Sequence, residues 1–103
     1  MRYLHCSELM PTADQNQKSF YGKARVETYI KNGKDVFILK SYSTDVLVIY
    51  KDKLYRSSDT YEGTFNRTTL KHCRAFVEQY IISDVRTKKE FMALDEICIA
   101  TLL

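Results

Sequence analysis

The chain has few of the residues that build disulfide frameworks, metal sites or phosphate-binding loops. Its three cysteines, Cys6, Cys73 and Cys98, are odd in number, widely spaced and outside any CxxC pair. A disulfide framework or a zinc site is therefore not expected. The three glycines stand apart from one another, which excludes a glycine-rich phosphate loop. The sequence predicts three reduced thiols and offers no metal or cofactor site.

Long apolar runs are also absent. No stretch approaches the roughly 18 apolar residues of a membrane span, and the N-terminus lacks the apolar centre of a secretory signal. We therefore expect a soluble protein of the cytoplasm. At 103 residues, 45% of them hydrophobic, residues 1–103 are expected to form a single domain. The net charge of +3 is mildly basic, short of what a dedicated nucleic-acid binder carries.

One strongly patterned stretch predicts the main helix, over about residues 69–82. Apolar residues recur there at spacings of three and four, which is typical of a helix with one apolar stripe. Thr68 or Thr69 could cap its first amides. A second helix is predicted over about 88–94, because Thr87 and Glu90 have the spacing of a capping box.

The first half of the chain has the alternation of strands. Residues 20–31 alternate between an apolar and a polar face, and Asn32-Gly33 predicts a tight hairpin turn before a second strand over 36–42. A turn near 41–45, a strand over 46–50 and a short strand over 54–56 follow. Residues 1–18 are weakly patterned and are expected to form a weakly structured N-terminal segment, whereas residues 96–103 fit either a helix or an edge strand.

These elements predict an α+β domain. We expect a three- to four-stranded antiparallel meander with the 69–82 helix packed on its apolar face, because such a sheet needs a helix to cover it. Catalytic groups are not expected. His72 and Cys73 are neighbours on a helix, so their side chains diverge by about 100° and cannot form a nucleophile–base pair.

The first candidate binding site is a basic cluster in the opening turns of the main helix. It consists of Arg67, Lys71, His72 and Arg74. Cations at a helix N-terminus oppose the helix dipole by about 0.3–1 kcal/mol each. Such a cluster favours an anionic partner, either phosphate or an acidic protein surface, although an ordinary solvated face has the same composition.

The second candidate is the outward face of the 20–31 strand, where tyrosines alternate with basic residues. Tyr21, Lys23, Arg25 and Tyr29 fall on this face. Exposed aromatic and basic side chains can stack on bases or anchor a protein interface. Cross-strand packing within a sheet favours tyrosine as well, so both interpretations stay open.

Four short motifs carry a resemblance over about residues 18–95. They are FYGKA at 20–24, SYSTDV at 41–46, TTLKH at 68–72 and TKKE at 87–90. In this order they resemble small proteins encoded by bacteriophages and other mobile elements of Gram-positive bacteria. Lys71 stands where arginine is expected in this pattern, which keeps the charge but weakens a bidentate contact.

The resemblance implies a non-enzymatic phage accessory protein that binds and inhibits a host protein, with a CRISPR–Cas effector as the favoured target. It assigns no residue to that role. The alternative is a small nucleic-acid-binding protein that places Lys23, Arg25, Arg67, Lys71 and Arg74 against phosphates. That alternative predicts affinity that falls steeply with salt.

Overall fold

The computed structural model describes residues 1–11 and 20–102. In chain order its elements are β1 (Arg2–Glu8), β2 (Ala24–Lys31), β3 (Lys34–Ser41), β4 (Thr44–Tyr50), β5 (Lys53–Ser57), the 3-10 turn η2 (Glu62–Thr64), α1 (Arg67–Tyr80), α2 (Lys88–Met92), β6 (Glu96–Ile97) and the 3-10 turn η3 (Ile99–Leu102). Strands and helices together make the α+β fold that the sequence predicts.

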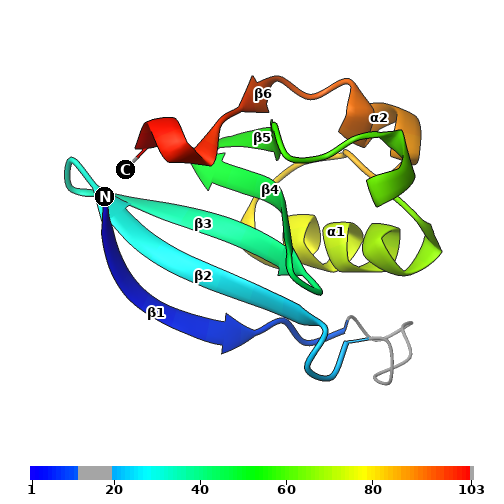
Figure 1. Ribbon diagram of the computed structural model, residues 1–103, viewed down its shortest axis with the longest axis horizontal. Coiled ribbons are helices and arrows are strands. Elements are labelled where there is room, and N and C mark those ends of the chain that lie inside the picture. Colours follow the sequence, from blue (N-terminus) through cyan, green and yellow to red (C-terminus); the bar gives the residue numbers. More distant parts are fainter. Residues whose placement is uncertain (12–19, 103) are drawn as a thin grey trace.

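Within the described residues, the strands form one six-stranded sheet in the order β1-β2-β3-β4-β5-β6 (Figure 1). Each of the first four strands pairs antiparallel with the next, whereas β6 pairs parallel with β5. The prediction of three or four strands is therefore too low. The two additional strands come from the chain ends, where the apolar alternation is too weak or too short to predict a strand.

The chain ends differ from expectation in a specific way. Residues 2–8 of the weakly patterned segment 1–18 form β1, all of whose side chains are exposed; residues 12–18 lie outside the described part. A strand without a buried face leaves no period-two signal. The C-terminal residues, predicted to form either a helix or a strand, contain the short strand β6 followed by the 3-10 turn η3.

Strand β2 begins at Ala24, four residues later than predicted. Residues 20–23 instead form a tight turn, in which the amides of Lys23 and Ala24 donate to the carbonyl of Phe20 at 2.9 and 3.2 Å. Gly22 adopts a φ of +66° in this turn, a conformation that glycine reaches without steric cost. The predicted Asn32-Gly33 hairpin is confirmed, with φ values of +54° and +76°.

Helix α1 begins two residues before the predicted start and ends two residues before the predicted end. Its cap is Asn66, whose side chain accepts from the amide of Thr69 at 2.9 Å, so the prediction of Thr68 or Thr69 as the cap is wrong. The capping box of α2 is confirmed, because Thr87 Oγ1 accepts from the amide of Glu90 at 3.2 Å. That helix ends at Met92, before the predicted 94.

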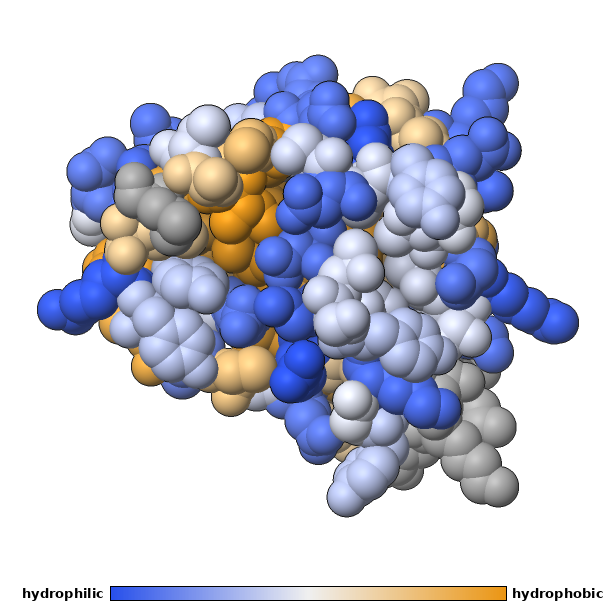
Figure 2. All heavy atoms as spheres, in the orientation of Figure 1, coloured by the Kyte–Doolittle hydropathy of each residue, from blue (hydrophilic) through white to orange (hydrophobic). Residues whose placement is uncertain are grey.

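The sheet buries apolar side chains on both faces. On one face the buried stripe of α1, including Phe76 and Val77, packs on strand residues such as Val26 and Leu39. On the other face Leu102 of η3 covers a smaller cluster made by β3 and β4. Figure 1 shows α1 behind the sheet and η3 crossing in front of it. The remainder of the front face is mainly hydrophilic (Figure 2).

Candidate functional site

A buried polar cluster joins the start of α1 to the end of β3. Ser41 Oγ lies 3.1 Å from Thr69 Oγ1 and 2.8 Å from His72 Nδ1. The rings of Phe20 and Tyr42 lie 4.9 and 6.0 Å from the imidazole. Three of the four motifs that carry the resemblance, FYGKA, SYSTDV and TTLKH, therefore meet at one point in the fold.

The position of His72 corrects the predicted basic cluster. Its side chain is buried, so it does not contribute to a surface. Thr69, His72 and Phe76 are three and four residues apart, so they share the buried face of α1. The prediction grouped His72 with Lys71 and Arg74 because they are adjacent in sequence, but helical spacing places His72 on the apolar stripe.

A serine bonded to a histidine also has the chemistry of an activated nucleophile. Here the exposed fraction is 3% for Ser41 and 0% for His72, so a substrate cannot reach either atom in this conformation. The pair instead satisfies polar groups that would be costly to bury alone. Burial also raises the pKa of the neighbouring thiol of Cys73, which keeps that sulfur protonated and unreactive.

The other members of the predicted cluster remain at the surface. Arg67 is exposed, whereas Lys71 and Arg74 are half-buried. Arg74 Nε donates to the carbonyl of Arg86 at 2.8 Å. The first turn of α1 contains no acidic residue, so no carboxylate within that turn balances the basic residues near the positive end of the helix dipole.

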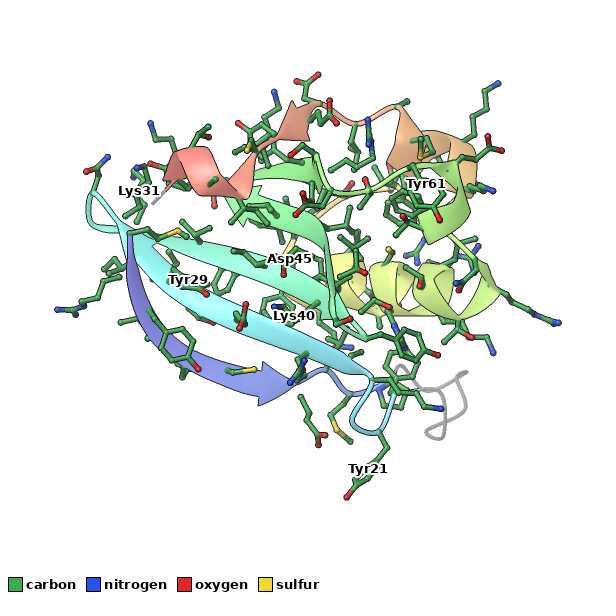
Figure 3. All side chains as sticks on the ribbon, in the orientation of Figure 1. Tyr21, Tyr29, Lys31, Lys40, Asp45 and Tyr61 are labelled. Atoms are coloured by element: carbon green, nitrogen blue, oxygen red, sulfur yellow. The ribbon has the colours of Figure 1, made fainter. Side chains whose placement is uncertain are left out.

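Three residues predicted on the strand face gather instead at one end of the sheet. Tyr21 is 75% exposed and points away from the molecule (Figure 3). The amide of Tyr42 donates to the carbonyl of Lys23 at 2.7 Å, and Arg25 Nη2 donates to the carbonyl of Tyr42 at 3.3 Å. We call Tyr21, Lys23, Arg25 and Tyr42 the aromatic–basic end. The start of α1 flanks it through the contact between Tyr42 and His72.

Tyr42 is the member of this end that the sequence analysis missed. It lies in the two-residue turn between β3 and β4 with a φ of +56°, a conformation that suits glycine or asparagine far better than a bulky residue. Its side chain is 48% exposed. One feature of the sequence could have indicated Tyr42. The hairpin turn Tyr42-Ser43 lacks the glycine and asparagine that two-residue turns favour.

Tyr29 lies apart from the aromatic–basic end, two residues before the end of β2 at the β2–β3 turn. Its ring meets Tyr3 edge-on at 5.4 Å, and its hydroxyl lies 3.4 Å from Glu27 Oε1. Burial, followed by the nearby Glu27 carboxylate, raises the pKa of Tyr29. Tyr29 therefore does not join Tyr21, Lys23 and Arg25 in one binding surface, as predicted, because its ring packs on Tyr3 and its hydroxyl lies beside the Glu27 carboxylate.

The centre of the same face carries more negative than positive charge. Lys40 Nζ lies 3.7 Å from Glu27 Oε1 and 3.3 Å from Asp45 Oδ1, in the middle of the sheet (Figure 3). Burial raises the pKa of Asp45 even though Lys40 opposes this shift. Two carboxylates around one ammonium make this area unsuitable for phosphate.

Residues 8–93 match a family of unknown function, DUF8033, and the chain belongs to this family. Comparison with curated proteins gave no match, and comparison with solved structures gave none either. In the described part of the chain, no helix is long and apolar enough to cross a membrane. Nor do three or more His, Cys, Asp or Glu side chains there gather closely enough to hold a metal ion.

Proposed function

We propose that this protein is a non-enzymatic binding protein that attaches to an acidic surface of another protein through its aromatic–basic end. The supporting observation is the pair of exposed tyrosines, Tyr21 and Tyr42, on two adjoining turns that hydrogen bonds from Arg25 and Tyr42 hold together. Tyrosine and arginine are the residue types that most often dominate the energy of protein interfaces.

The backbone of Tyr42 adds support to this proposal. A bulky residue in the left-handed region is strained by roughly 1–3 kcal/mol. Part of that strain is offset where the ring packs beside His72, but about half of the side chain stays exposed. An exposed aromatic side chain held at such a position fits a contact residue, because the turn fixes its direction before binding.

We further propose that the partner is a host protein that this chain inhibits, with a CRISPR–Cas effector as the favoured target. This part of the proposal rests on the resemblance to phage-encoded proteins, since no residue is specific to that role. A protein partner is favoured over nucleic acid because Glu27 and Asp45 occupy the open sheet face.

Binding to a purified effector tests the proposal, with affinity measured by calorimetry for four forms of the protein. Tyr21→Ala and Arg25→Glu should each weaken binding about tenfold or more, which corresponds to about 1.4 kcal/mol. The matched control is Tyr61→Ala, because Tyr61 is 70% exposed but lies at the N-cap position of η2. Equal loss in the control, or no loss in the two variants, would contradict the proposed surface.

Nucleic acid is the competing partner, favoured by the basic residues that flank the start of α1. A titration of plain duplex DNA at several salt concentrations separates the two cases. If Arg67, Lys71 and Arg74 contact phosphates, the affinity should fall by about 0.9 log units per contact for each tenfold rise in salt. If Arg67→Glu abolishes DNA binding and Tyr21→Ala does not, the proposed partner is nucleic acid and not a protein.

A further inference from the structure

A second candidate surface lies at the C-terminal end of α1, next to residues of β3 and β4. An open groove of about 500 Å³ is bounded there by sheet residues and the last turn of the helix. Its lining residues are Phe37, Ile49, Asp52, Glu78, Gln79, Tyr80, Ile81 and Ile82. Five of these eight are apolar or aromatic, so the groove can bury an apolar side chain.

The rim of this groove is negative although the chain as a whole carries +3. Glu78 and Asp52 are the charged residues among its lining. The last turn of α1 contains no basic residue, so nothing there offsets the negative end of the helix dipole. In the part of the chain that the structure describes, Glu78 forms a long ion pair of 3.9 Å with Arg86, and both side chains are about half exposed.

An apolar side chain stands uncovered beside the groove. Ile82 is fully exposed, the most exposed large hydrophobic side chain among the described residues. Ile81 next to it is half-buried against the main core. The rings of Phe37 and Tyr80 pack at 5.2 Å in the floor. Apolar side chains gathered around one hollow are typical of an interaction site rather than of ordinary surface.

We propose that this groove binds a basic segment of another protein, one in which an aliphatic side chain stands next to arginine or lysine. The aliphatic group would contact Phe37, Ile81 and Ile82, while the cation would lie between Glu78 and Asp52. A cation there also meets the negative end of α1 and two aromatic rings, all of which favour positive charge. The groove is separate from the aromatic–basic end and does not depend on it.

Nuclear magnetic resonance of the ¹⁵N-labelled protein tests this proposal. The probe is an acetylated peptide of alternating leucine and arginine, added to about millimolar concentration. We expect amide shifts at Phe37, at Asp52 and over residues 79–82. A leucine–glutamate peptide should leave these signals unchanged, and a serine–arginine peptide should bind more weakly because it lacks the aliphatic groups.

Variants then locate the contact. Glu78→Gln and Ile82→Ser should each weaken binding of the leucine–arginine peptide roughly two- to fivefold, as expected for single contacts at an exposed rim. Glu62→Gln is the control, because Glu62 is an exposed carboxylate on η2, outside this groove. Spectra of the free variants show directly that each is folded.

Several outcomes would overturn the proposal. They are equal binding of the leucine–glutamate peptide, shifts confined to the aromatic–basic end, and no shift at about 5 mM peptide. A dilution series of the protein alone covers one more case. If the same amides shift with protein concentration, a second copy occupies the groove and the proposed partner is wrong. None of these results affects the test of Tyr21 and Arg25.

Discussion

The hydroxyl of Ser41 and the imidazole of His72 illustrate how single residues join distant parts of this chain. They are 31 positions apart, yet they lie 2.8 Å from one another, and Thr69 completes the cluster. Each polar atom is buried, so each requires a partner to avoid the cost of losing water. The cluster thus fixes the start of α1 against the end of β3 more specifically than apolar contacts alone would.

Replacing Ser41 by alanine should lower the free energy of unfolding by about 1–3 kcal/mol, because His72 Nδ1 and Thr69 Oγ1 would lose a buried partner. Ser43→Ala is the matched control. Ser43 is exposed in the adjoining turn, and its replacement should change stability by less than about 0.5 kcal/mol. Urea unfolding of the two variants measures the difference, and equal effects would contradict a structural role for the cluster.

Asp45 should make stability depend on pH. Because burial raises its pKa above the ordinary 3.8, the folded state binds the proton more tightly than the unfolded state does. Stability due to this group is therefore present at low pH and is lost as pH rises from about 3.8 through the folded pKa. Relative to Asp45→Asn, the unmodified protein should lose stability over that interval in urea unfolding at successive pH values. A gain instead would show that Lys40 outweighs the effect of burial.

At the scale of elements, the parts predictable from sequence are those with a strong local signal. Helix α1 has its apolar stripe, the β2–β3 turn has Asn32-Gly33, and α2 has its capping box. Strand β1 could not be predicted because its side chains are all exposed and its pairing with β2 is non-local. Asn66 was overlooked as a cap because two threonines closer to the apolar run fit the same role.

The cap of α1 can be tested separately from its packing. Asn66→Ala should lower the free energy of unfolding by about 1 kcal/mol, because the amide of Thr69 loses its acceptor. Asn66→Asp should retain the bond and add a favourable charge near the helix N-terminus. Thermal unfolding followed by circular dichroism measures both. If Thr68→Ala were the more harmful change, the cap would be misassigned.

At the scale of the whole molecule, the sheet needs cover on both faces. The larger face is covered by α1, and part of the other by η3, whose Leu102 is buried beside Val36, Ile38 and Val48. Lys31 Nζ also donates to the carbonyl of Leu102 at 2.9 Å. The sequence predicted one apolar face because most of this second cover comes from a tail too short to show a period.

Removing most of the Leu102 side chain should therefore destabilise the whole fold. Leu102→Ala should lower the free energy of unfolding by about 2–4 kcal/mol, as for other buried leucines. Thr101→Ala is the control, because Thr101 is exposed and bonds only within its own turn in the described structure. Calorimetry of both variants decides the matter. A loss below about 0.5 kcal/mol for Leu102→Ala would mean that η3 adds little to the second core.

At this scale, the sequence predicted individual residues of the candidate site but not how they are arranged. Basic residues at the start of α1 and the Tyr21–Arg25 stretch follow from composition and spacing, but their arrangement depends on contacts between β2, the β3–β4 turn and α1. Local pattern cannot show that Tyr29 is turned toward Glu27 or that His72 is enclosed. Those facts depend on which segments the fold brings together.

The parallel pairing of β5 with β6 also bears on how the protein is made. Arg56 meets Glu96, forty positions later in the chain, whereas the turns that join β2 through β5 are two residues long. During synthesis those strands can pair soon after they leave the ribosome, while the residues that close the far edge have not yet been translated. The half-made sheet then exposes the apolar side that α1 later covers. During that interval, chaperone binding would protect the nascent chain from aggregation.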